Sequence, residues 1–288
     1  MSAHRTTVLA LLLAPAAALG YVQTTTASSS PPCPGPAVPL EWFHLPVGYQ
    51  ADSAGSDDIT GTSAQEAVDA SFATWSAPTC TAVDFVAAAP GPTTVGFQLG
   101  GPNVNAVKWI ETGWTQSAQA IAVTLTTFSC TTGEILDADI TLNGASFTFT
   151  TEPSTTAADV QNTVTHEAGH LLGFDHSPDP DSTMYADAPL GETTKRSLTD
   201  DDITGLCTVY PTDFQPPSTG GTPTSKHHGG CSGGPAGAPA LALVLALVGR
   251  RLARRRPASY PYGRTGEIWE RSFSASMAGR RHWPRSHT

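Results

Sequence analysis

The spacing of apolar and polar positions along the chain predicts three helices. Val68, Phe72 and Trp75 recur at helical intervals, which places one apolar face on a segment that begins with a Ser-Ala-Gln-Glu capping box. A second apolar face includes Val160 and Val164, and a run of Thr followed by three Asp residues caps a third helix. We expect the first helix at 63–76, the second at 157–172 with Thr156-x-x-Asp159 as its capping box, and the third at 200–209.

Short β-rich runs separated by turn residues predict the strands, and a Thr-Gly turn separates the last two of them. In the last run, Asp137 and Asp139 share one face and Leu136 and Ala138 the other, as in a half-exposed antiparallel sheet. Strands and helices do not alternate regularly, which favours an α+β domain. The predicted strands are 40–45, 83–87, 94–98, 106–110, 120–128 and 134–143, after an irregular leader, 21–39.

The two ends of the chain differ from its centre. The first 20 residues have a basic start, an apolar run and small residues before Tyr21, as in a secretory signal peptide; an uncleaved anchor is the alternative. Beyond Pro216 a stretch rich in Gly, Pro, Ser and Thr indicates a linker. An apolar run of about 14 residues follows, shorter than the roughly 20 that span a bilayer comfortably. We divide the chain into a signal peptide (1–20), a folded domain (21–214), a linker (215–232), an apolar segment with an Arg cluster (233–256) and an unassigned basic tail (257–288).

Charge and cysteine content limit the possible functions. Between residues 21 and 225 there are three basic residues and 23 acidic ones, so this part has no basic face for nucleic acid. Four cysteines lie in the folded domain and a fifth, Cys231, lies in a Gly-rich stretch. In an exported protein four cysteines indicate two disulfides, with three possible connectivities. Our preferred pairing is Cys33–Cys80 and Cys130–Cys207.

Candidate chemistry is concentrated between residues 166 and 176, which have the pattern H-E-x-x-H-x-x-G-x-x-H. His166 and His170 lie one turn apart on one helix face and can bind the same cation. Gly173 can take a left-handed conformation, end the helix and turn the chain back, so that His176 reaches the same ion. Three neutral imidazoles around an open fourth position are typical of a catalytic zinc site. The alternative is an amphipathic helix that carries histidines by chance, which the extended pattern disfavours.

Glu167 follows the first of these histidines. A carboxylate at this position is better placed as a general base for water than as a metal ligand. We therefore expect Glu167 to be catalytic and His166, His170 and His176 to hold one zinc ion.

Four features of residues 40–211 together resemble the matrixins, a family of metzincin zinc endopeptidases. They are the extended zinc motif, Met184 in Ser-Thr-Met-Tyr (similar to the Met-turn beneath the zinc), the terminal-helix sequence Leu-Thr-Asp-Asp-Asp-Ile-Thr-Gly-Leu, and the first helix ending near Trp75. Ser177 is also the matrixin-type residue after the third histidine. An ordinary buried Met is the alternative for Met184.

This resemblance implies an α+β metzincin-like domain with a twisted mixed sheet, an antiparallel edge strand and three helices. It also implies a cleft between that edge strand and the motif helix for a protein or peptide substrate, with Gly173 and Met184 supporting the site. The latency motif and the second zinc site of animal matrixins are missing. The residues around Cys33 resemble the latency motif only weakly, so a zinc-blocking Cys33 thiolate is a minor alternative to the disulfide. Calcium sites could use Asp175, Asp179 or Asp181, but no recognisable calcium-loop spacing supports them.

The C-terminal part resembles a MYXO-CTERM sorting tail, with Cys231, an apolar run and an Arg cluster. That resemblance implies membrane association through the tail before it is cut near Cys231. The protein would then be extracellular or on the outer surface of a bacterial envelope. Residues 257–288 depart from the resemblance, because such tails end at the Arg cluster; a GPI signal is the alternative.

The sequence therefore predicts an exported, monomeric zinc endopeptidase that hydrolyses peptide bonds with a Glu general base. A catalytically inactive zinc-containing surface module that binds a partner is the alternative. Neither the substrate nor the cleavage specificity follows from the residues after Met184.

Overall fold

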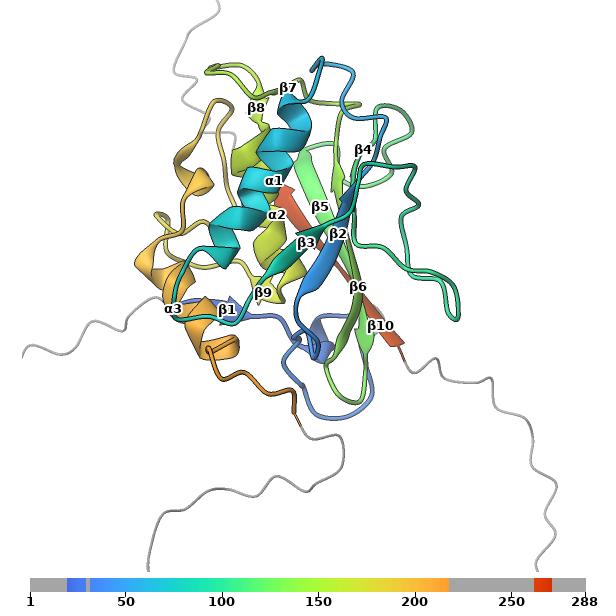
Figure 1. Cartoon of the computed structure of the whole chain (residues 1–288), viewed down its shortest axis with the longest axis vertical. Helices are drawn as coiled ribbons and strands as arrows, with labels where there is room; N and C mark the ends of the chain where they lie inside the picture. The colour runs from blue at the N-terminus through green and yellow to red at the C-terminus, as the bar shows by residue number, and fades with distance from the viewer. Residues whose placement is uncertain (1–19, 30–31, 218–261, 271–288) are drawn as a thin grey trace, which may run out of the picture.

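A twisted six-stranded sheet forms the centre of the computed structural model, which describes residues 20–29, 32–217 and 262–270 (Figure 1). Four strands are parallel, β5 is antiparallel to β6, and β10 is antiparallel to β5. The predicted α+β architecture, a mixed sheet with an antiparallel strand and three helices, is confirmed. Across the sheet the order is β10 (Tyr262–Glu270), β5 (Ala120–Ser129), β6 (Ile135–Leu142), β4 (Ala106–Trp109), β2 (Val47–Ala51) and β3 (Phe85–Ala87).

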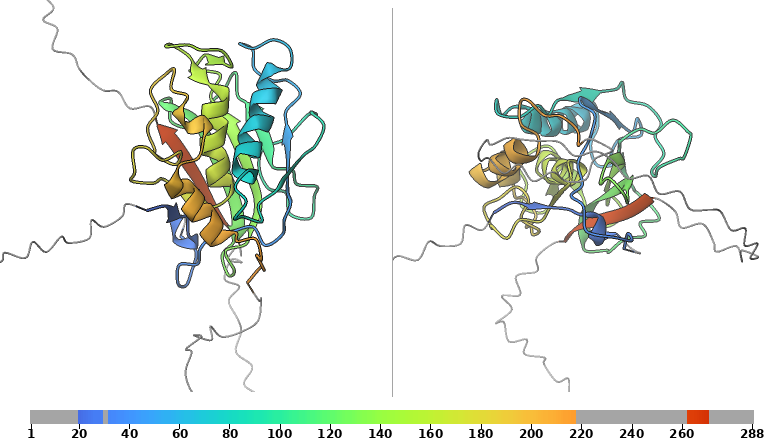
Figure 2. Two further views of the ribbon diagram at one scale, coloured as in Figure 1. Left: turned by 60° about the vertical axis from the view of Figure 1, so that its left-hand side comes forward. Right: turned by 90° about the horizontal axis from the view of Figure 1, so that it is seen from below.

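The helices lie close to their predicted positions: α1 is Ser63–Ser76, α2 is Val160–Leu171 and α3 is Asp200–Val209. Helices α1 and α2 lie side by side on one face of the sheet (Figure 2), where the Trp75 indole N–H donates to the carbonyl of Thr165 at 2.8 Å. The N-cap of α1 is Thr62 rather than Ser63, and its hydroxyl lies 2.7 Å from a carboxylate oxygen of Glu66. The N-cap of α2 is Asp159 rather than Thr156, and its carboxylate accepts from the Asn162 N–H at 2.8 Å.

The predicted irregular leader and first strand are both partly wrong. Within 21–39, β1 (Val22–Gln23) pairs with β9 (Phe174–Asp175), and a short 3-10 helix follows. Residues 40–45 form no strand: Leu40 is buried, but the backbone there makes only an isolated bridge from Glu41 to Glu134. The first strand of the main sheet begins at Val47 instead. The apolar run at 40–45 predicted a strand, but a buried apolar run need not pair as one.

Strand β6 is buried on both faces, which corrects the predicted half-exposed sheet. Asp139, on the polar face, accepts hydrogen bonds from the backbone N–H groups of Gly96 (2.5 Å) and Ala106 (2.9 Å). Residues 94–98, predicted as a strand, are therefore part of a loop that covers this face. A polar face was thus read as solvent-exposed when backbone donors satisfy it. Two further short strands, β7 (Phe149–Thr150) and β8 (Ala158–Asp159), pair in front of α2 in the sequence.

The disulfides are Cys33–Cys130 and Cys80–Cys207, so the predicted pairing is wrong. The leader runs beside the β5–β6 hairpin, which brings Cys33 to the residue after β5. The segment after α1 bridges to the segment after α3 through Thr81 and Pro211, which brings Cys80 to α3. Because Cys33 is oxidised, it is not a thiolate available to block a metal.

Among the described residues, no helix has the length and apolarity needed to cross a membrane. The predicted signal peptide except Gly20, Cys231, the apolar segment and the Arg cluster lie outside the described residues.

Candidate metal centre

Helix α2 and the turn after it bring the three predicted histidines together. The Nε2 atom of His170 lies 3.1 Å from Nε2 of His166 and 3.2 Å from Nε2 of His176. All three can offer a ligand atom within 4.8 Å of one another. Ligands held about 2.0–2.1 Å from a tetrahedral zinc lie about 3.3–3.4 Å apart, so the spacing fits this metal.

Hydrogen bonds made by the Nδ1 atoms of His166 and His170 determine which ring nitrogens face the centre. His166 Nδ1 lies 2.7 Å from the carbonyl oxygen of Thr183, and His170 Nδ1 lies 2.7 Å from that of Phe174. A carbonyl oxygen only accepts, so both Nδ1 atoms carry the proton and both Nε2 atoms carry lone pairs. Two facing lone pairs at 3.1 Å cannot bond to each other, and a cation between them satisfies both. The donor set therefore fits zinc.

Burial keeps the histidines in the form that binds metal. Burial, and then the nearby His176, lowers the pKa of His170 to about 3. Burial likewise lowers the pKa of His166 well below its usual value, and that of His176 to a smaller degree. Neutral imidazole is the ligand form, so protonation does not compete for the site near neutral pH.

Gly173 turns the chain so that His176 can reach the centre. Its φ of +92° lies in the left-handed region, and a Cβ there would meet the carbonyl oxygen of Leu40 at 2.4 Å. Beyond it, β9 is held by β1, and the Thr24 N–H donates to the Gly173 carbonyl at 2.8 Å. The N-terminal segment thus fixes the turn that presents the third histidine.

Glu167 is buried on α2 and faces strand β5. The hydroxyl of Thr124, in the middle of β5, lies 2.6 Å from Glu167 Oε2 and 3.1 Å from the Glu167 carbonyl oxygen. This contact orients the carboxylate and joins the helix to the sheet. The sequence gives no sign of it, because Thr124 is one of several threonines in a β-rich run.

Asp202 connects helix α3 to the metal centre. Its Oδ2 accepts from the N–H groups of Thr183 (2.9 Å) and Thr199 (2.8 Å), and its Oδ1 accepts from the hydroxyl of Ser182 at 2.6 Å. The Thr183 carbonyl is the partner of His166, so Asp202 supports the histidine ring through the backbone of a single residue, Thr183. Such outer partners fix the orientation of metal-binding histidines. Asp201 similarly accepts from the hydroxyl of Ser177 at 2.8 Å.

Met184 is buried and packs against α2 at Gly169. A Cβ on Gly169 would lie 2.2 Å from the Met184 sulfur and 2.8 Å from Trp75 Cζ2. Gly169 lies outside the predicted site residues, although a glycine inside a helix indicates a packing constraint. Only a glycine permits this approach of helix, methionine and tryptophan.

We expect Gly169→Ala to lower the free energy of unfolding by about 1–3 kcal/mol, because the added methyl group overpacks this contact. The higher helix propensity of Ala, worth about 1 kcal/mol, offsets part of that cost. Chemical denaturation measures the change. In a Met184→Ala background the same substitution should cost less, and equal costs in both backgrounds would contradict the packing argument.

The segment after Met184 contains a buried cation that the sequence analysis overlooked. Lys195 Nζ donates to the carbonyl of Asp187 at 2.7 Å and lies 3.3 Å from a carboxylate oxygen of Glu192. Burial lowers the pKa of Lys195.

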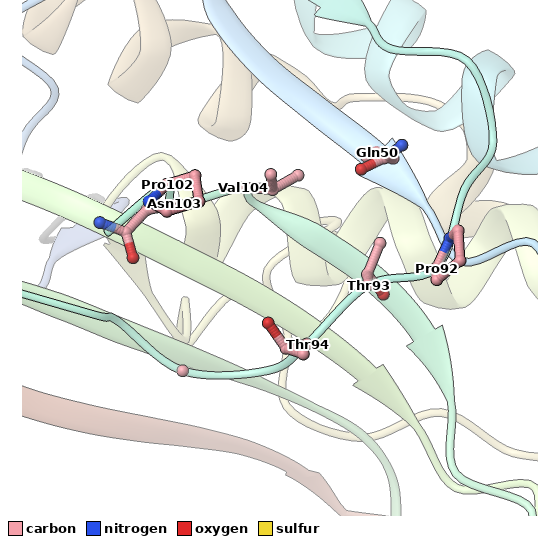
Figure 3. A pocket seen from close by; sticks show the side chains of 8 residues that line it. Gln50, Pro92, Thr93, Thr94, Pro102, Asn103 and Val104 are labelled. Atoms are coloured by element: carbon pink, nitrogen blue, oxygen red, sulfur yellow. The ribbon is translucent and has the colours of Figure 1, made fainter.

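A separate hollow lies between β2 and the loop that follows β3 (Figure 3). Gln50, Thr93, Thr94 and Asn103 contribute polar groups to it, but no ionisable side chain lines it. None of the three histidines or Glu167 belongs to this hollow, so the candidate chemistry remains at the histidine cluster.

Comparison with known proteins finds similarity in the part of the chain that contains the histidine cluster. The matrixin family profile matches residues 41–211. Metalloendoproteinase 1 of Glycine max is 42% identical over 66 residues, which are 23% of this chain and 21% of that protein. Neutrophil collagenase of Homo sapiens is 41% identical over 61 residues, 21% of this chain and 13% of that protein. The chain therefore spans about a fifth or less of the length of these relatives.

Proposed function

This chain belongs to the matrixin family of zinc metalloendopeptidases, and we propose that it hydrolyses internal peptide bonds with Glu167 as general base. The observation that carries the proposal is the convergence of three imidazole Nε2 atoms, with the buried Glu167 next to the first of these histidines in the chain. A site used only for structure needs the ligands but not the carboxylate.

His166, His170 and His176 would hold the zinc through Nε2. When bound, zinc supplies Lewis acidity, which polarises a carbonyl group and makes water a nucleophile near neutral pH. Glu167 takes a proton from the attacking water on a carboxylate oxygen and delivers it to the leaving amine nitrogen. Thr124 holds that carboxylate in place through Oε2. The rings of His166 and His170 are kept in one tautomer by the carbonyls of Thr183 and Phe174.

The setting of the enzyme is a further part of the proposal. We propose that the protein is exported through its N-terminal 20 residues, is monomeric, and reaches the cell surface or the medium through its C-terminal tail. Two disulfides between residues distant in sequence support an oxidising compartment. The substrate is a protein or peptide, and calcium has no assigned role.

Metal removal tests the proposal. We expect the purified protein to contain one zinc per chain and to cleave an unstructured protein such as casein. Dialysis against a zinc chelator should abolish cleavage and lower Tm, since a metal that binds only the folded state stabilises it. Adding zinc back should restore both.

A calcium-selective chelator provides the control and should leave the zinc content unchanged. Cleavage that persists after the zinc is gone would contradict the proposal. One bound zinc without any cleavage would support the inactive binding module instead.

A further inference from the structure

Strand β10 returns to the domain from far along the chain and pairs with β5. The pairing is antiparallel and runs from Tyr262 opposite Ser129 to Glu270 opposite Ala120, with one irregularity after Trp269. Both views place β10 along the outer side of β5 (Figures 1 and 2). It lies beyond the residues that match the matrixin family, 41–211, and no strand was predicted there. Without β10, β5 would present a row of unpaired backbone groups.

The part of β5 that β10 covers is next to the catalytic carboxylate. Glu267 is the partner of Thr124, and Thr124 contacts Glu167. Paired Cα atoms in an antiparallel ladder lie about 4.5–5.5 Å apart. A backbone added to this edge therefore passes within one side chain of the group that handles the proton.

An extended peptide can bind this edge through its backbone alone. Strand addition to a free sheet edge uses main-chain hydrogen bonds, which tolerate many sequences. The segment Tyr-Gly-Arg-Thr-Gly-Glu-Ile-Trp-Glu contains no proline, so every residue keeps its N–H group, and it includes several good strand formers. Because the segment belongs to the same chain, its effective concentration at the edge exceeds that of a peptide in solution.

We propose that residues 262–270 are an internal, substrate-like strand that occupies the peptide-binding edge of β5 and keeps the enzyme in an inhibited form. This inference rests on the proposed peptidase function of the site. The occupied form cannot accept a substrate on β5, so only the fraction of molecules with β10 released is competent. The apparent KM rises by the inverse of that fraction, while kcat at saturating substrate is unchanged. Cleavage of the chain near Cys231, as proposed for the tail, would remove the inhibitor.

The test uses the full chain with Thr265→Pro and Gly266→Pro together. Alternate N–H groups of an antiparallel strand point toward its partner, so two adjacent prolines remove at least one ladder bond and clash with continued pairing. The matched control, Ala275→Pro with Ser276→Pro, carries the same change outside β10. Cleavage of a fluorogenic peptide gives KM and kcat, and hydrogen exchange reports on the amides of β5.

For the β10 variant we expect a KM at least tenfold lower than that of the wild type, an unchanged kcat, and faster exchange in residues 120–129. The control should match the wild type. A synthetic peptide with the sequence of residues 262–270 should inhibit the variant competitively, and the same peptide with prolines at the two substituted positions should not.

Unchanged KM and unchanged exchange in the β10 variant would overturn the inference. Faster exchange without any change in KM would also overturn it, because β10 would then cover an edge that substrates do not use. If all forms fail to cleave but exchange in β5 rises, β10 occupies the edge and the peptidase function is what fails.

Discussion

Replacing Glu167 with Ala is expected to lower kcat by about 10²–10⁴-fold while zinc remains bound, the range that a positioned general base contributes. Glu167 is not among the converging ligand atoms, so its loss leaves three imidazoles in place. The Thr124 hydroxyl loses its partner at Oε2 but keeps the backbone carbonyl at 3.1 Å, so the helix stays joined to the sheet. Casein cleavage and zinc content, measured on the same sample, check both halves of this prediction.

Glu167→Gln is the matched control because it keeps the shape of the side chain but removes the carboxylate. It can retain a hydrogen bond with Thr124 but cannot take up a proton at neutral pH, so its activity should be as low as that of the Ala variant. Cleavage by Glu167→Ala at the wild-type rate would show that another group is the base. Loss of zinc from the Gln variant would show that the carboxylate supports the metal rather than the reaction.

Asp202→Asn should weaken zinc binding by about 10–100-fold, the effect typical of partners behind metal-binding histidines. The amide replaces one carboxylate oxygen with a donor, which then faces either the Thr183 and Thr199 N–H groups or the Ser182 hydroxyl. Lost hydrogen bonds to a buried charge should also lower the free energy of unfolding by about 3 kcal/mol. Competition with a fluorescent zinc chelator measures affinity, and thermal unfolding of the zinc-free protein measures the stability change separately.

Asp200→Asn removes a charge from the same first turn of α3 at an exposed position, and it should change neither zinc affinity nor Tm appreciably. Equal zinc affinity in Asp202→Asn and the wild type would mean that the 182–184 turn holds His166 without help from α3.

Local sequence patterns predicted the helices and the clustering of the three histidines because both depend on short-range geometry. Val68, Phe72 and Trp75 mark a buried helix face wherever the helix packs, and the spacing of His166 and His170 is a property of the helix itself. Contacts between distant segments left no such pattern. The whole fold determines which residues meet in three such contacts. They are the Cys33–Cys130 disulfide, the hydrogen bond between the Thr124 hydroxyl and Glu167, and the pairing of β10 with β5.

The burial of Asp139 shows why polar patterns mislead. Its alternation with apolar neighbours predicted a solvent-exposed face. Instead, one backbone N–H group of the covering loop and one of β4 donate hydrogen bonds to its carboxylate. Sequence periodicity separates apolar from polar faces, but it does not distinguish solvent from backbone donors as the partner of a carboxylate.

The bond from Asp202 to the Thr183 N–H has a consequence for the order in which the enzyme matures. A chain being synthesised or exported exposes its histidines well before α3 has emerged. Until Asp202 is available to hold residues 182–184, the acceptor for His166 Nδ1 is not fixed, and a tight metal site is not expected. A nascent or truncated chain that ends before α3 should therefore be unable to cleave its neighbours.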